Sequence, residues 1–136
     1  MLDSLFQKNK ENGLLWAGKS KYLGRRFWLS SRLLETLVQL AVLKEDSESS
    51  ENPYFSEPIL IEDFLQSLLA RYGFIINGIS HPRFEQAGID AHQAFQDNVQ
   101  NLKQRLREIG FFNVLSDAYI MQRIRPRYPI VKGGEI

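Results

Sequence analysis

The 136-residue sequence predicts a mainly α-helical protein with a small antiparallel β-sheet, an α+β fold. Three observations support this prediction. Three segments repeat their apolar residues every three to four positions, which is the spacing of one helix face. A short apolar run at residues 58–61 has the length of a strand. Near the carboxyl end, two extended stretches surround residues 116–118, which have the composition of a turn.

The chain begins with a polar amino-terminal segment, residues 1–13, in which we expect little regular structure. Residues 14–29 alternate large aromatic side chains with Gly18 and Gly24, which favours short extended segments over a helix. Within them, Trp16 is expected to pack on the core and Lys19 to be exposed.

The first helix is expected at residues 30–43, where Ser30 or Ser31 can cap it. Its apolar face comprises Leu33, Leu34, Leu37, Val38 and Ala41. An acidic, serine-rich loop is expected to follow at residues 44–53 and to end at Pro53.

The second helix is expected at residues 62–72, directly after the strand at residues 58–61. Glu62 and Asp63 suit the positive end of the helix dipole, and Gly73 ends the helix. Its buried residues are expected to be Phe64, Leu65, Leu68, Leu69 and Tyr72. An irregular connection then follows, with a turn at Asn77 and Gly78.

The longest helix is expected to run from Asp90, as its cap, to about Ile109, with Gly110 closing it. Its apolar face comprises Ala91, Phe95, Val99, Leu102, Leu106 and Ile109. The two strands that follow are expected to form a hairpin over residues 111–127, after which Pro126 and Pro129 end the regular structure. We expect one domain over residues 14–128 and a carboxy-terminal tail, residues 129–136.

The charges are segregated, although the net charge is only +1. Residues 1–34 carry seven basic and two acidic side chains, whereas residues 35–66 carry one basic and eight acidic ones. Residues 103–136 are again basic, with seven against three. Two interpretations remain open: a basic face for a polyanion, or basic ends that pair with the acidic middle. The absence of cysteine and of a long apolar run predicts a cytoplasmic protein without a membrane span.

Residues 13–20 read GLLWAGKS and match the phosphate-binding pattern G-x-x-x-x-G-K-[ST]. A working site of this kind needs a buried strand before the pattern and a helix that begins at its lysine. Here the polar sequence QKNKEN precedes it, its interior is bulky, and Gly24 argues against a helix after Lys19. We therefore interpret the match as coincidental.

Other catalytic patterns are weaker. His81 and His92 are the only histidines, and their spacing does not suit a zinc site in a chain without cysteine. We interpret them as surface or capping residues. The sequence thus predicts a non-enzymatic protein with no catalytic residues, no metal and no cofactor.

The order of these elements resembles that of the winged-helix (winged helix-turn-helix) superfamily. The residues that carry the resemblance are EPILIEDFLQSLLARYG, the long helix ending in LKQRLREIG, and FFNVLSDAYIMQRIRP in the place of the wing. It covers roughly residues 30–128 and concerns the pattern of elements alone. One departure is the connection at residues 74–89, because a tight turn joins the second and third helices in DNA-binding members.

The long helix and the wing carry the candidate nucleic-acid-binding residues. Amide and guanidinium groups read base edges, and arginines neutralise phosphates. The candidates are Gln100, Gln104, Arg105 and Arg107 on the helix, and Arg123, Arg125 and Arg127 on the wing strand and its exit. In a strand, the alternation would place the three wing arginines on one side. The alternative is that the amides form a neutral solvated face and the arginines pair with acidic groups.

Two functions follow from these observations. One is a bacterial-type DNA-binding domain, in a regulator or a larger nucleic-acid machine, with double-stranded DNA as its partner. The other is a protein-interaction module of a multi-subunit assembly, in which the acidic residues 45–63 and the long connection dock a partner protein. Either function is compatible with an oligomer.

Overall fold

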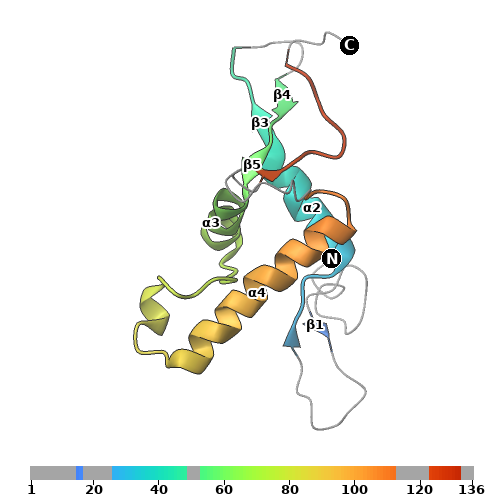
Figure 1. Cartoon of the computed structure of the whole chain (residues 1–136). Helices are drawn as coiled ribbons and strands as arrows, with labels where there is room; N and C mark the ends of the chain where they lie inside the picture. Colours follow the sequence, from blue (N-terminus) through green and yellow to red (C-terminus); the bar gives the residue numbers. More distant parts are fainter. Residues whose placement is uncertain (1–14, 17–25, 49–52, 113–122, 133–136) are drawn as a thin grey trace. The chain divides into compact units, whose positions relative to one another are not determined.

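The computed structural model describes residues 15–16, 26–48, 53–112 and 123–132 (Figure 1). These residues form three α-helices, one 3-10 helix and three two-stranded antiparallel sheets, which confirms the mainly helical α+β class. The chain divides into two compact units, Met1–Val38 and Gln39–Ile136. In the part of the chain that is described, no helix is both long and apolar enough to cross a membrane.

The first unit contains a short sheet and most of the first helix. Strand β1 (Leu15–Trp16) pairs with β2 (Arg26–Phe27), in agreement with the expected extended segments. Helix α2 (Ser31–Val42) begins after Ser30, whose buried Oγ accepts a hydrogen bond from the Leu33 N–H at 3.4 Å. This bond confirms the capping role of Ser30. The predictions for Lys19 and for the Trp16 side chain lie outside what the structure describes.

A hairpin of two strands follows α2 in the second unit. Strand β3 (Leu43–Glu45) pairs with β4 (Tyr54–Ser56) in antiparallel register, with Lys44 opposite Phe55. The prediction of a loop over residues 44–53 was therefore wrong for Lys44 and Glu45, which belong to strand β3. The β-favouring Tyr54 and Phe55 supply a partner that draws Lys44 and Glu45 into a sheet, although neither has a strong strand preference of its own.

Helix α3 (Ile61–Tyr72) follows strand β5 (Ile59–Leu60) without a break. It ends as expected at Gly73, which has φ 70° and donates its N–H to the carbonyl groups of Leu68 and Leu69. This left-handed conformation is one that glycine adopts without steric cost. Tyr72 does not join the buried face as expected. Its side chain is 41% exposed and stacks on Phe74, which follows the turn, with ring centroids 6.0 Å apart.

Helix α4 (Ile89–Glu108) matches the expected long helix, but its cap differs. Gly88 occupies the capping position with no side-chain hydrogen bond, and Asp90 lies inside the first turn, so the prediction of Asp90 as cap was wrong. Asp90 instead suits the positive end of the helix dipole. At the other end Gly110 has φ 84°, and the Phe111 N–H bonds to the Leu106 carbonyl at 2.9 Å, which closes the helix.

A small sheet joins the end of α4 to the start of α3. Strand β6 (Arg123–Ile124) pairs with β5, with Ile124 opposite Ile59, and Ile124 also forms a bridge with Phe112. Both Ile124 and Phe112 are buried. The described ends of the expected hairpin are therefore paired, while residues 113–122, which contain its turn, lie outside the description. The sheet is compatible with the winged-helix order of elements.

The carboxy-terminal segment lies along the outer edge of β4. The Ser56 N–H donates to the Ile130 carbonyl at 3.0 Å, and the Ile130 N–H donates to Ser56 Oγ at 2.8 Å. Lys132 Nζ then lies 3.1 Å from Asp46 Oδ2 and 5.5 Å from the centroid of the Phe55 ring. Part of the acidic segment after α2 is thus neutralised by the carboxy-terminal end of the described chain.

Candidate nucleic-acid interface

The carboxyl end of α4 carries an exposed polar network. Gln104 Nε2 donates to Glu108 Oε1 at 3.1 Å, and Arg107 Nη1 donates to Gln104 Oε1 at 3.4 Å. The Arg107 guanidinium carbon lies 5.5 Å from the centroid of the buried Phe112 ring, within cation–π distance. Arg107 is exposed all the same, so its guanidinium is positioned by the protein and accessible from solvent.

Arg105, two positions earlier, has a different environment. Its side chain is half-buried, and this burial lowers the pKa of the guanidinium while the nearby Glu108 opposes the shift. An arginine stays protonated in proteins, so the positive charge remains. Arg105 also makes an interaction within the chain. Of the two arginines expected on this helix face, Arg107 is therefore the one that is open to a ligand.

The backbone holds Arg123 and Arg125 on both sides of a buried residue. Arg123 lies opposite Leu60 in the sheet, Ile124 is fully buried, and the Arg125 N–H donates to the Phe111 carbonyl at 2.9 Å. Both arginine side chains are exposed. Neither forms an ion pair within the described parts of the chain.

Arg127 differs from these two. Strand β6 ends at Ile124, so Arg127 lies beyond the strand and beyond Pro126 rather than in a row of three along one strand. Its guanidinium carbon lies 5.8 Å from the centroid of the exposed Tyr128 ring. Arg127 is exposed, but it lies in the segment that follows β6 and not in the strand itself.

Phe112 connects these features. Its ring lies under Arg107, and its backbone forms the bridge with Ile124, which separates Arg123 from Arg125. We name Arg107, Arg123 and Arg125 the arginine cluster. Gln100 and Gln104 are exposed on α4, and the Gln100 side chain makes no hydrogen bond with another described residue. One helix arginine and two wing arginines from the expected set are thus connected through the Phe112–Ile124 bridge.

The connection between α3 and α4 is ordered by local contacts that the sequence reveals only in part. Asn77 Oδ1 accepts the Ile79 N–H at 3.2 Å, which confirms the expected turn. His81 Nδ1 accepts the Arg83 N–H at 3.2 Å and caps a 3-10 helix, Pro82–Phe84. This contact confirms the capping interpretation of His81.

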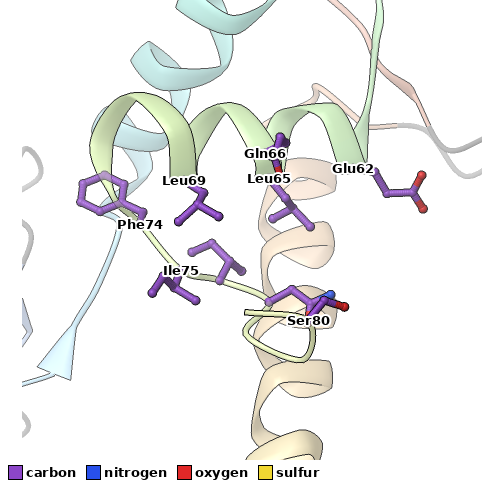
Figure 2. Close-up of a pocket in the computed structure, with 9 residues that line it drawn as sticks. Glu62, Leu65, Gln66, Leu69, Phe74, Ile75 and Ser80 are labelled. Atoms are coloured by element: carbon purple, nitrogen blue, oxygen red, sulfur yellow. The ribbon is translucent and has the colours of Figure 1, made fainter. Parts of the chain in front are cut away.

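A cleft of about 210 Å³ lies between α3 and this connection (Figure 2). It was not expected from the sequence; the apolar run Phe74–Ile75–Ile76 after a helix-ending glycine was its only signal. The residues that line it are Glu62, Leu65, Gln66, Leu69, Phe74, Ile75, Ile76, Asn77 and Ser80. Within the described residues, no three or more His, Cys, Asp or Glu side chains are placed to hold a metal ion.

These features define a small α+β protein with an exposed arginine cluster at a helix–sheet junction and a separate, largely apolar cleft. The chain belongs to the family described as methylation-associated defense system protein MAD7, whose family model matches residues 1–128. No curated protein and no solved structure matches the chain. The comparisons indicate no winged-helix family, so that resemblance is one of element order alone.

Proposed function

We propose that this chain is a non-enzymatic, DNA-binding component of the defense system for which its family is named. The arginine cluster is the observation that supports the proposal. Arg107, Arg123 and Arg125 are exposed around one junction, and no carboxylate within the described residues forms an ion pair with them. Exposed positive groups that no described carboxylate neutralises are suited to contact the phosphates of a duplex.

The exposed face of α4 would supply the second part of the interface. The connection contacts α4 through Phe84 and Phe95, and Phe95 belongs to the apolar face of that helix. Gln100 and Gln104 remain exposed. The long connection, which argued against a recognition helix at the level of sequence, therefore leaves the polar face of α4 uncovered.

A salt titration tests this proposal. Binding of a fluorescent random-sequence duplex is measured by anisotropy at several salt concentrations, for the unmodified chain and for Arg107→Gln, Arg123→Gln and Arg125→Gln. Removing one arginine that neutralises a phosphate should reduce the slope of log affinity against log salt by about 0.9. Arg123→Glu combined with Arg125→Glu should abolish binding, because it replaces attraction by repulsion.

Arg71→Gln is the matched control, since Arg71 is an exposed arginine in the last turn of α3. It should leave the salt slope unchanged. If the unmodified chain shows no affinity tighter than about 10⁻⁴ M at low salt, the weak limit of ordinary non-specific binding, the proposal fails.

A second proposal is that a partner protein docks on the acidic segment around the β3–β4 hairpin. Glu45 and Glu48 are exposed, and Tyr54, which pairs with Glu45, is 49% exposed. Asp46 is already paired with Lys132, so it does not belong in the test variant. A pull-down with the other proteins of the defense system should lose its partner when Glu45 and Glu48 are changed to Gln, and Glu35→Gln on α2 serves as a control.

A further inference from the structure

The cleft between α3 and the connection has an apolar floor and an acidic end. Leu65 and Leu69 on α3 face Ile75 on the connection, and Phe74 and Glu62 stand at opposite ends of the row (Figure 2). The apolar lining residues are half-buried rather than buried, so part of their surface is available to a ligand. Glu62 itself is exposed.

Hydrogen bonds on both sides define the shape of the cleft. At one end, Gly73 closes α3 and the Phe74 N–H donates to the Leu68 carbonyl at 3.1 Å. At the other end, Asn77 Oδ1 accepts the Ile79 N–H. The backbone that carries Ile75 and Ile76 is therefore held between two closed turns.

The connection packs against α4 through Gly78 and Phe84, which both contact Phe95. A Cβ atom added at Gly78 would lie 2.5 Å from Cζ of Phe95 and 2.9 Å from Cδ2 of Phe84. Such distances show that the backbone at Gly78 lies directly against the two rings. Residues 74–80, which form one wall of the cleft, thus contact the rings of Phe84 and Phe95 at Gly78.

The volume of the cleft decides between two kinds of ligand. Sites for small molecules and cofactors usually enclose about 300–1,000 Å³, whereas this cleft measures about 210 Å³. It is too small to bury most of a cofactor. Its size and apolar floor suit one large apolar side chain, which is the usual anchor of a docked peptide.

The charge at the rim of the cleft indicates which kind of side chain would lie beside the apolar anchor. Among the described residues that line the cleft, Glu62 is the only charged one, and it forms no ion pair with another described residue. Gln66, Asn77 and Ser80 are polar and uncharged. A negative rim repels phosphate and attracts a basic side chain, so the cleft and the arginine cluster suit ligands of opposite charge.

We propose that the cleft docks a peptide segment of a partner protein, which inserts one large apolar side chain and places a Lys or Arg beside Glu62. This inference deepens the protein-binding proposal, at a surface different from the β3–β4 hairpin. It does not depend on duplex binding.

A library of random linear peptides, displayed and selected against the whole chain, tests the inference. The enriched peptides should share a Leu, Ile, Met or Phe with a Lys or Arg within one helical turn or two strand positions. Synthetic copies should bind Glu62→Lys about threefold to tenfold more weakly than the unmodified chain, the range expected when an exposed ion pair is replaced by repulsion. Asp63→Lys is the matched control, because Asp63 is exposed in the same helical turn but does not line the cleft.

Amide chemical shifts locate the bound peptide without the need for a core mutation. Shifts at Leu65, Leu69 and Ile75, with none at Arg123 and Arg125, are expected. The inference is overturned if no peptide binds tighter than about 1 mM, if the peptides share no such pair of residues, or if both lysine variants weaken binding equally. Duplex binding, measured separately, should be unchanged in Glu62→Lys apart from a small increase in affinity, so failure of one proposal leaves the other intact.

Discussion

The ring of Phe84 meets the ring of Phe95 edge to face, with centroids 5.0 Å apart. Phe84 belongs to the connection between α3 and α4, and Phe95 belongs to the amino-terminal half of α4. This contact, together with Gly78, anchors the connection on the apolar face of the helix. The connection is therefore part of the packed structure, with one side against α4 and the other side forming the cleft.

Gly78→Ala should destabilise the protein by about 1–3 kcal/mol, the usual cost of inserting a methyl group into a packed site. The added Cβ would lie 2.5 Å and 2.7 Å from two atoms of the Phe95 ring, so the ring or the backbone must shift. Urea denaturation measures the change. Gly88→Ala is the control: nothing lies within 4 Å of its added Cβ, and its cost should stay below about 1 kcal/mol as a weakening of the helix cap.

Leu102→Ala should lower the free energy of unfolding by about 2–5 kcal/mol, because its side chain is 5% exposed and its removal leaves a cavity. Asn101→Ala, at the adjacent exposed position, should change stability by less than about 0.5 kcal/mol. Thermal or urea unfolding distinguishes the two. Similar decreases for both variants would contradict the burial of Leu102 in the core.

Acid should remove the contribution of the Asp46–Lys132 contact. The hydrogen bond from Lys132, and then the one from the Glu48 N–H, hold the pKa of the Asp46 carboxyl below its usual value. Since the folded pKa lies below the unfolded one, about 3.9, the stabilisation is present above the unfolded value. It disappears as the pH falls through the folded value.

Asp46→Asn should therefore be less stable than the unmodified chain near neutral pH, and the difference should vanish in strong acid. Urea midpoints across the acidic range measure it. Glu48→Gln keeps the backbone N–H that bonds to Asp46 and should follow the unmodified chain. A constant difference at every pH would show that the carboxylate charge is not the cause.

Gln100 and Gln104 should behave differently in duplex binding. Gln104 is engaged with Glu108 and Arg107, while the Gln100 side chain makes no hydrogen bond with another described residue. If amides of α4 read base edges, Gln100→Ala should alter the preference among duplex sequences by about 1–3 kcal/mol. Gln104→Ala should act mainly through Arg107 and weaken all sequences alike. Competition among duplexes of different sequence measures both effects.

Local sequence was enough to place the three helices. Ser30 acts through its own Oγ, Gly73 and Gly110 act through their own backbone, and helix periodicity is a property of short segments. The expected bounds therefore differ from the observed ones by about one residue. The exposure of Arg123 and Arg125 likewise follows from their positions on either side of the buried Ile124.

Tertiary structure decided the pairings that join distant segments. Nothing in the neighbourhood of Ile124 indicates that it pairs with Ile59, nor does the sequence near Asp46 point to Lys132. Which of Arg105 and Arg107 is open to solvent also depends on elements packed at the end of α4. Such contacts form only when folding brings together residues that are far apart in sequence. A local pattern does not specify which strand, ring or charged group will be the partner.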